Sequence, residues 1–223
     1  MKNLPLLKRG QIAFAVSLLS VTCLGHRTAW AENLIENPGF EAESTVWQNF
    51  IPAGSKDKVQ EFQIVTDNPH AGHSCAQCSA TDFVRYGITV PSKGIPVAPG
   101  ERYHFQAWVR FAGDSVSMTG APQVYIRATL LKAPGVSSTD PLGHINIGLN
   151  GKMARDANVR KLSPRQESKD WQLISGVFEV PADTTCIVPT LFILGVQGKV
   201  YWDDVSFEKV PSDTPLTPDI ANK

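Results

Sequence analysis

The segment Arg102–Phe111, RYHFQAWVRF, constrains the fold most, because apolar and polar residues alternate along its whole length. With a period of two, one face of a strand carries Tyr103, Phe105, Ala107, Val109 and Phe111. The opposite face carries Arg102, His104, Gln106, Trp108 and Arg110. The first face predicts half of a hydrophobic core. The second predicts an outward face with one large aromatic side chain, although a half-covered Trp108 among ordinary solvent-facing residues is the simpler alternative.

A second segment, Gln123–Leu131, repeats this alternation and predicts that Tyr125, Arg127 and Thr129 face outward. Further strands are predicted over residues 58–66, 74–81, 84–90, 171–180, 184–194 and 199–207. Gly- and Pro-rich turns separate these segments, and no long helical period occurs. The pattern predicts an all-β fold, a β-sandwich or jelly roll.

The first 31 residues have the pattern of a secretory signal peptide. Lys2, Lys8 and Arg9 precede a short apolar run over residues 11–25, and Ala29-Trp30-Ala31 fits a cleavage site. We therefore expect cleavage after Ala31 and a secreted or periplasmic protein. Lipidation of Cys23 is the less favoured alternative, because the residues before it lack the leucine of a lipobox.

Removal of this leader changes the charge balance. The chain has 21 basic and 21 acidic residues, and the leader holds four of the basic and none of the acidic ones, which leaves 17 against 21, a net charge of −4. This balance gives no general attraction to nucleic acid or to an anionic membrane surface. Beyond the leader, no apolar run is long enough to span a bilayer.

Three cysteines remain after the leader, Cys75, Cys78 and Cys186. An odd number leaves at least one thiol unpaired, and Cys75 and Cys78 face opposite sides of a strand. A Cys78–Cys186 disulfide and three buried free thiols both stay open. The spacing H-x-x-H-x-C-x-x-C, from His70 to Cys78, also suggests a transition-metal site, but it matches no familiar zinc pattern.

Residues 32–209 are expected to form one domain, with a long insertion over residues 133–170 and a disordered tail over residues 210–223. The insertion carries a possible strand over residues 144–149 and six basic residues: Lys152, Arg155, Arg160, Lys161, Arg165 and Lys169. It would either overhang the Trp108 face or form a solvated excursion.

Five sequence blocks occur in the order typical of one family of modules. They are NLIENPGFE followed by Trp47, TDNPHAGHS, VAPGERYHFQAWVR, WQLISGVFEVPA and YWDDVSF. Together they extend over residues 33–209, nearly the whole chain after the leader, and the chain resembles the carbohydrate-binding modules of the family 4/9 kind. The resemblance implies a galactose-binding-like jelly roll whose concave sheet binds glycans, in modules that are usually attached to glycoside hydrolases.

Three features depart from this family pattern. The chain carries no hydrolase domain, and it has the long insertion over residues 133–170. The turn continues as Gly72-His73-Ser74-Cys75-Ala76, where the family usually has Gly-Lys-(Tyr/Ser)-Ser-Leu. The identity of the glycan is therefore left open.

The resemblance also implies a structural calcium ion, whose acidic ligands match Glu41 and Asp203. Asp203 is expected to share the inward face of its strand with Val205 and Phe207, and an inward carboxylate needs a partner or a metal. Two carboxylates with backbone carbonyls could form a hard oxygen site. A salt bridge or a hydrogen-bonded strand end is the alternative.

The expected glycan contacts combine an aromatic platform with planar polar groups. The candidate residues are Trp108, Tyr125, Arg127, Gln106 and His104. Trp202 is a second aromatic candidate on an outward face, whereas Trp47 and Trp171 fall in framework blocks and are expected in the core. A glycan binder should present Trp108 exposed beside Tyr125 in a groove.

Enzymatic function has little support in the sequence. Gly113-Asp114-Ser115 resembles the nucleophile block of some esterases, but the matching downstream Asp-x-x-His is absent and no G-x-S-x-G occurs. We expect a protein that binds polysaccharide or oligosaccharide without cleaving it, with a separate hydrolase or envelope partner. A structural or protein-binding envelope domain is the alternative, and a stand-alone glycosidase is less favoured.

Overall fold

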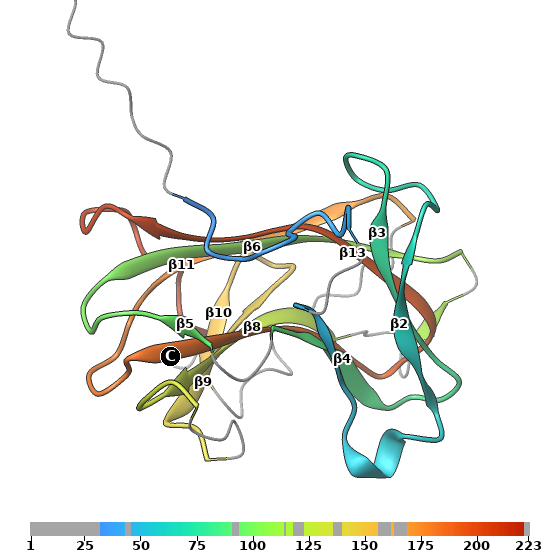
Figure 1. The fold of residues 1–223 in the computed structure, drawn as a ribbon, viewed down its shortest axis with the longest axis horizontal. Coiled ribbons are helices and arrows are strands. Elements are labelled where there is room, and N and C mark those ends of the chain that lie inside the picture. The colour runs from blue at the N-terminus through green and yellow to red at the C-terminus, as the bar shows by residue number, and fades with distance from the viewer. Residues whose placement is uncertain are drawn as a thin grey trace, which may run out of the picture. The chain divides into compact units, whose positions relative to one another are not determined.

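The computed structural model consists of two antiparallel β-sheets packed face to face (Figure 1). It describes residues 32–42, 46–90, 94–113, 115–117, 123–135, 140–155, 162 and 169–220. The expected signal peptide therefore lies outside the described residues, and its cleavage stays a prediction. Residues 31–223 form a single compact unit. The prediction of an all-β sandwich is confirmed.

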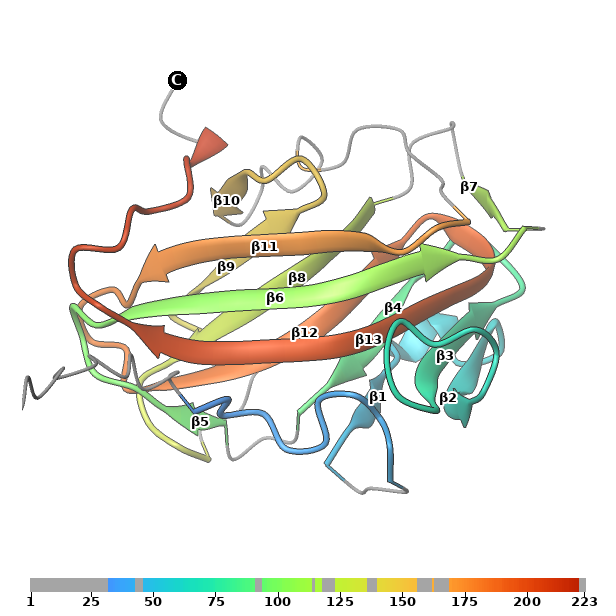
Figure 2. The same cartoon turned by 90° about the horizontal axis from the view of Figure 1, so that it is seen from above.

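The first sheet, here called the β6 sheet, runs in the order β11-β6-β13-β3-β2. Its strands are β11 (Gln172–Glu179), β6 (Arg102–Phe111), β13 (Val196–Val210), β3 (Cys75–Ala80) and β2 (Val59–Val65), and β7 (Val116–Ser117) pairs with β13. Seen from above, β11, β6 and β13 run side by side across the molecule (Figure 2).

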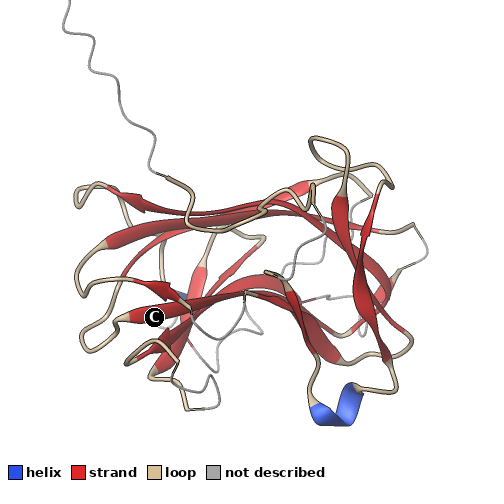
Figure 3. Ribbon diagram, viewed as in Figure 1, coloured by secondary structure: helices blue, strands red, loops and turns tan. Residues whose placement is uncertain are grey.

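The second sheet, here called the β8 sheet, runs in the order β1-β4-β12-β8-β9-β10. Its strands are β1 (Gln48–Phe50), β4 (Arg85–Thr89), β12 (Cys186–Leu194), β8 (Gln123–Leu131), β9 (Gly143–Gly148) and β10 (Met153–Arg155), and β5 (Ile95–Pro96) pairs with β12. The one helical element of the described residues is the short 3-10 turn η1 (Ala53–Ser55) (Figure 3).

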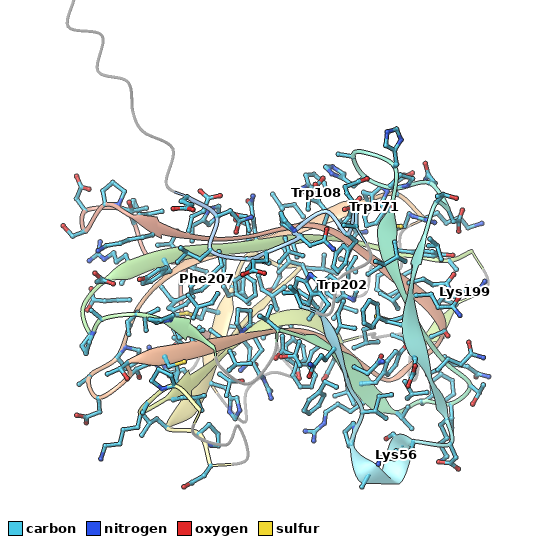
Figure 4. All side chains as sticks on the ribbon, viewed as in Figure 1. Lys56, Trp108, Trp171, Lys199, Trp202 and Phe207 are labelled. Carbon is cyan, nitrogen blue, oxygen red and sulfur yellow. The ribbon has the colours of Figure 1, made fainter. Side chains whose placement is uncertain are left out.

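The core lies between the two sheets and follows the predicted alternation. The five apolar residues of Arg102–Phe111 and the inward residues of β8 are all at most 3% exposed and belong to one apolar cluster. Trp202 and Phe207 lie in this layer between the sheets (Figure 4). Trp47 also belongs to the core, as expected, and packs on Phe40 with ring centroids 5.1 Å apart.

A β-bulge in β13 changes the expected orientation of its side chains. The register against β6 shifts between Asp203 and Ser206, and Asp204 adopts a positive φ of 44°. Before the bulge Trp202 faces the core, and after it Val205 and Phe207 do. The prediction that Asp203 points inward with Val205 is therefore wrong, and so is the prediction of an outward Trp202, which is 0% exposed.

The described part of the insertion extends the β8 sheet. Strand β9 confirms the strand expected near residues 144–149, and β10 pairs with β9 at the edge of the sheet. These strands lie on the sheet opposite to β6, so they do not cover Trp108. Of the six basic residues, Arg160, Lys161 and Arg165 lie outside the described residues.

The C-terminal residues 211–220, here called the strap, have defined contacts, although the sequence predicts disorder for them. Thr217 exchanges hydrogen bonds with Val177 of β11, and the N–H of Met153 in β10 donates to the carbonyl of Pro218. Asp219 also forms an ion pair with Arg155, at 3.4 Å. The strap therefore joins the edge strand of the β6 sheet to the edge strand of the β8 sheet.

The three cysteines of the described chain are buried, and no disulfide joins any two of them. Cys78 lies in the central core, whereas Cys186 lies in a separate cluster with Leu131 and Val188. The Cys78–Cys186 disulfide is therefore not formed. No helix among the described residues is both long enough and apolar enough to span a membrane.

Candidate functional site

The structure divides the five predicted glycan contacts between two faces. His104, Gln106 and Trp108 lie on the outer face of the β6 sheet, whereas Tyr125 and Arg127 lie on the outer face of the β8 sheet. The prediction that Trp108 and Tyr125 share one groove is therefore wrong. Alternation along a strand identifies faces correctly, but it cannot say which strands belong to one sheet.

On the β6 sheet, Trp108 is covered by a loop. The ring of His70 stacks on its indole with ring centroids 3.9 Å apart and an angle of 18°, and His70 Nδ1 lies 2.5 Å from Asp204 Oδ2. Trp171 meets the same His70 ring edge-on at 5.9 Å. Trp171 is half-buried in this outer cluster, so its predicted place in the core is wrong. Figure 4 shows Trp108 and Trp171 on the outer side of this sheet.

The two polar candidates on β6 lie further along the same outer face. His104 is half-buried, and its Nε2 lies 2.7 Å from Ser175 Oγ. Burial lowers the pKa of His104, and the nearby Glu208 carboxylate opposes this shift. Gln106 lies in register with Ser175 and Ser206. These residues form a polar strip that is separate from the loop over Trp108.

An arginine holds that loop onto the β6 sheet. The Arg110 guanidinium lies 3.9 Å from the centre of the Tyr201 ring and donates to the carbonyl of Asp67 at 2.5 Å. The Tyr201 hydroxyl donates to the Asp67 carboxylate at 2.7 Å, and this bond is the main reason why the pKa of Asp67 is lowered. Trp171 Nε1 donates to the carbonyl of Asn68. Trp108 is thus half-buried beneath the loop of residues 67–74, as in the simpler alternative of a half-covered side chain.

The two predicted metal ligands bind this loop through backbone N–H groups. Glu41 accepts hydrogen bonds from the N–H groups of His73 and Ser74. Asp203 Oδ2 accepts from the N–H groups of His70 and Ala71, at 2.8 and 3.3 Å. Burial raises the pKa of Asp203 to about 6.

This donor set does not fit a calcium site in the conformation described, because N–H groups surround both carboxylates where a cation requires oxygen ligands. No group of three or more His, Cys, Asp or Glu side chains among the described residues is arranged to hold a metal ion. Calcium at Glu41 and Asp203 therefore stays a prediction. The H-x-x-H-x-C-x-x-C residues are not assembled into a site either, since Cys78 faces the core while His70 packs on Trp108.

On the β8 sheet, three aromatic rings form a row across the outer face. The rings of Tyr125 and Phe192 stack with centroids 5.2 Å apart and an angle of 7°, and the rings of Phe192 and Phe50 are 4.9 Å apart. Phe50 and Phe192 lie on β1 and β12, which flank β4, and Gly87 of β4 is in register with both. Because Gly87 has no side chain, the two rings can meet across it.

Two arginines pack on these rings. The Arg127 guanidinium carbon lies 4.3 Å from the centre of the Phe192 ring, and Arg127 Nε donates to Asn146 Oδ1 at 2.7 Å. Asn146 is fully buried and donates in turn to the carbonyl of Ala154. The Arg85 guanidinium carbon lies 5.9 Å from the Phe50 ring centre, and Arg85 is exposed. The guanidinium groups of Arg127 and Arg85 thus pack over neighbouring aromatic rings on this face.

Part of the aromatic row is covered by the chain itself. Tyr125 and Phe192 are 1% and 2% exposed, and they form a cluster with Leu162 of the insertion and Ile220 of the strap. The prediction that Tyr125 offers an open ring to a ligand is therefore wrong. Burial raises the pKa of the Tyr125 hydroxyl. Of the aromatic row and its two arginines, Phe50 and Arg127 stay partly exposed and Arg85 is exposed.

No pattern in the sequence identifies Phe50, Phe192 or Asn146 as outward-facing residues of this site. Strand β12, CIVPTLFIL, is apolar except at Thr190, so Phe192 could not be distinguished from an inward residue. Arg85 precedes the alternating residues of β4 and looks like an ordinary strand end. In contrast, the outward position of Arg127 is confirmed.

Solved structures similar to this one are mostly carbohydrate-binding modules. Endo-1,4-β-D-xylanase 10B of Clostridium thermocellum, as its family 22 module and family 10 hydrolase with xylohexaose, has a TM-score of 0.54 and 13% identity over 80% of this chain. The C-terminal family 22 module of that xylanase, studied for the residues of its ligand-binding cleft, has a TM-score of 0.50 and 12% identity over 80% of this chain and 94% of its own.

A third similar structure belongs to an enzyme. It is the enzymatically active domain of tailspike protein 4 of bacteriophage CBA120, with a TM-score of 0.51 and 13% identity over 80% of this chain. The present chain spans 29% of the xylanase structure and 21% of the tailspike structure. No protein-family model matches the sequence, and no curated protein matches it significantly.

At these identities the likeness shows the jelly-roll sandwich fold and nothing finer. Two of the three structures contain family 22 modules, whereas the sequence blocks resemble the family 4/9 kind. The property common to both resemblances is the sandwich of a carbohydrate-binding module.

Proposed function

We propose that this protein binds polysaccharide or oligosaccharide on the outer face of the β8 sheet and does not cleave it. The observation that carries the proposal is the row of Phe50, Phe192 and Tyr125 with Arg127 stacked on it. Aromatic faces desolvate the C–H side of a sugar ring, and planar donors orient its hydroxyl groups. Phe50, Arg85 and Arg127 are the groups that a glycan would touch.

The curvature of this sheet supports the same face. The ribbons of β8, β12 and β4 arch in Figure 1, with β9 and β10 beyond one end of the arch and η1 beyond the other. In the family 22 module with a TM-score of 0.50, residues of a cleft were studied for their role in ligand binding. A curved outer face with planar side chains is the corresponding feature here.

Binding without catalysis is a separate part of the proposal and needs its own test. Glycoside hydrolysis usually requires two carboxyl groups on opposite sides of the scissile bond. The described strand residues that face outward on the β8 sheet include no Asp or Glu. Because the tailspike neighbour is an enzyme, incubation with an oligosaccharide panel followed by product analysis is the test of this point.

The setting proposed for this activity rests on the sequence. The leader predicts export to the periplasm or the medium. Modules of the family 4/9 kind, and the family 22 module with its hydrolase, suggest that the protein acts beside a separate glycoside hydrolase or envelope partner. Weak binding by a single module could then be reinforced by avidity.

The experiment is a binding panel of soluble β-glucans, xylans, mannans and galactans, measured by affinity electrophoresis and calorimetry. Phe50→Ala and Arg127→Ala should each weaken binding to the selected glycan about tenfold or more, since each removes a planar contact. Trp108→Ala, on the other sheet, should leave binding within twofold. Loss of binding with Trp108→Ala alone would move the site to the β6 sheet, and no binding to any glycan would reject the proposal.

A protein-binding role is a second candidate, favoured by one observation on the β6 sheet. Leu173 of β11 is 41% exposed and lies in register with Trp108. An apolar side chain beside a half-buried tryptophan could contact a protein partner. Cross-linking of the wild-type protein and of Leu173→Asp in an envelope fraction tests this role; an unchanged set of products would reject it.

A further inference from the structure

A serine, a histidine and a glutamate lie in line across the outer face of the β6 sheet. Ser175 is on β11, His104 is on β6 and Glu208 is on β13, and these three strands run side by side (Figure 2). Glu208 is the direct partner of His104 in the register of β13 against β6, whereas Ser175 is the partner of Gln106, two residues further along β6. The histidine is therefore the middle member of the three.

The contacts of these side chains give them the roles of nucleophile, base and carboxylate. His104 Nε2 lies 2.7 Å from Ser175 Oγ, which is within reach for transfer of the hydroxyl proton to the ring. On the other side of the histidine, the Ser206 hydroxyl donates to Glu208 Oε1 at 2.5 Å and holds that carboxylate in place. Serine, histidine and carboxylate occur in this order in hydrolytic triads on unrelated folds.

Burial and charge suit His104 to act as a base. Burial lowers the pKa of His104 from its ordinary value, so the ring is neutral at pH 7 and can accept a proton. The Glu208 carboxylate opposes this shift, which means that it stabilises the imidazolium once the proton has arrived. The neighbouring Glu179 pairs with Arg102, whereas no described lysine or arginine forms an ion pair with Glu208.

We propose that Ser175, His104 and Glu208 form a catalytic site that hydrolyses carboxylic esters with short acyl groups. Ser175 Oγ attacks the carbonyl carbon of the ester while its proton passes to His104 Nε2, which then gives the proton to the departing alcohol. Water, deprotonated by the same nitrogen, attacks the acyl group on Ser175 and releases the acid and the free serine. The net reaction is ester plus water to acid plus alcohol. It goes beyond the proposed glycan binding, uses the other sheet and leaves glycosidic bonds intact.

The neighbours of Ser175 supply a donor for the oxyanion and contacts for the acyl group. Gln106 is directly opposite Ser175, where Cβ atoms are about 4.5–5.5 Å apart, and we assign the oxyanion to its side-chain amide. Leu173 and Val177 flank Ser175 on the same face of β11, and Leu173 is 41% exposed. Two apolar neighbours of this size match an acetyl or propionyl group better than a long acyl chain.

The first test is labelling of the full chain with a fluorophosphonate, which reacts with a serine hydroxyl that a neighbouring base activates. Mass spectrometry of the digested protein should find the label on Ser175 in the folded chain and not after unfolding in urea. Ser212, an exposed serine of the strap, is the internal control and should stay unlabelled in both. This measurement uses the wild type, so it does not depend on the folding of any variant.

The second test is hydrolysis of p-nitrophenyl acetate, propionate and octanoate. The rate on acetate should saturate, and kcat/KM for acetate should exceed that for octanoate about tenfold or more. Ser175→Ala and His104→Ala should each lower kcat/KM about hundredfold or more, within the range that a general base contributes. Ser212→Ala and His73→Ala, at exposed positions away from this site, should leave it within twofold. Urea unfolding of each variant checks that the fold is intact.

The role of Glu208 needs a readout that a loss of stability alone would not move. Glu208→Gln should lower kcat/KM about tenfold or more and shift the half-maximal rate to lower pH, because the carboxylate raises the pKa of His104. Glu208→Asp keeps the charge and should restore part of the rate. The other charged groups that the flanking strands place on this face near the ring, Arg102 and Glu179, pair with each other and are the same in both variants.

The outcomes separate this site from the glycan face. A label on Ser175, together with saturable hydrolysis that Ser175→Ala removes, would establish the catalytic site. The absence of that label, or equal hydrolysis by wild type and Ser175→Ala, would overturn it and leave glycan binding in place. Phe50→Ala and Arg127→Ala, on the β8 sheet, should keep hydrolysis within twofold; a loss as large as that in Ser175→Ala would also overturn the assignment to the β6 sheet.

Discussion

The imidazole of His70 lies nearly parallel to the indole of Trp108, with 3.9 Å between the ring centroids, and its Nδ1 meets the Asp204 carboxylate. One side chain thus couples the loop over residues 67–74 to both β6 and the bulge in β13. Trp108, which the sequence predicts to be exposed, is therefore the side chain on which this loop packs.

Replacement of His70 by Ala should therefore uncover Trp108 and loosen the loop. We expect a red shift of tryptophan emission and a loss of about 1 kcal/mol in the free energy of unfolding, since a stacked aromatic pair contributes about 0.5–1.5 kcal/mol. Fluorescence and urea unfolding measure the two effects. His73→Ala, at an exposed position of the same loop, is the control and should change neither. An unchanged emission spectrum in His70→Ala would contradict the stacking.

The raised pKa of Asp203 predicts how stability changes with pH. The folded carboxyl keeps its proton up to about pH 6, whereas the unfolded chain releases it near pH 3.8. Folding therefore becomes less favourable as the pH rises through this window. The Asp203→Asn side chain cannot ionise. The free energy of unfolding of this variant, relative to that of the wild type, should therefore rise by about 2 kcal/mol between pH 4 and pH 7.

Urea unfolding at four pH values, in the presence of a chelator, measures this difference. Asp213→Asn in the exposed strap is the control and should follow the wild type at every pH. If Asp203→Asn lost stability relative to the wild type as the pH rose, the carboxylate would be stabilised in its charged form, and the burial argument would be wrong.

Gly87 is expected to tolerate no side chain. A Cβ at this position would lie 2.0 Å from the carbonyl oxygen of Leu191, which is backbone and cannot move cheaply. The next nearest atoms, the carbonyl carbon of Leu191 and the Cα of Phe192, are also backbone, at 3.1 and 3.3 Å. Gly87→Ala should cost about 2 kcal/mol or more in urea unfolding. Gly54→Ala, where nothing lies within 4 Å of the new Cβ, should be neutral or slightly stabilising.

Removal of the strap should destabilise the sandwich. Truncation after Val210 deletes the two hydrogen bonds between Thr217 and Val177 and the contact of Ile220 with the Tyr125 cluster. We expect a loss of about 2–4 kcal/mol in the free energy of unfolding, from lost hydrogen bonds and apolar burial. Truncation after Ile220 is the matched control. Equal stability of the two truncated proteins would support the disordered tail that the sequence predicts.

Calcium binding at Glu41 and Asp203 is a separate prediction from the family resemblance. A calcium ion would displace the N–H donors now bound to these carboxylates and would keep Asp203 ionised. Calorimetric titration after chelation, on wild type and Glu41→Gln, measures it. Heat in the wild type that Glu41→Gln removes would establish the site. The absence of heat would leave the two carboxylates as anchors of the loop.

The faces of single strands could be predicted from the sequence, and the partners of those strands could not. In β6 and β8 the period of two gives the inward residues correctly, because it depends only on local backbone geometry. Whether Trp108 and Tyr125 share a sheet depends on pairing between strands far apart in the chain. The pairing of strands that decides this leaves no pattern in the sequence of either strand.

Two other errors have local causes. In β13 the extra residue near Asp203 shifts the alternation, so Trp202 and Val205 both face inward although they are three residues apart. In β12 every residue except Thr190 is apolar, since the strand lies under the core on one face and, at Phe192, under Leu162 and Ile220 on the other. A pattern without alternation predicts burial but cannot predict by what the strand is covered.

The strap also determines how this sandwich behaves toward other copies of itself. The outer edge of β11 would present free backbone N–H and C=O groups at Val177, and Thr217 occupies both. On the opposite sheet, the carbonyl of Pro218 accepts a hydrogen bond from the N–H of Met153 in β10. Unoccupied sheet edges recruit strands from other molecules and start aggregation. A segment whose composition resembles a dispensable tail thus protects the β11 and β10 edges against self-association.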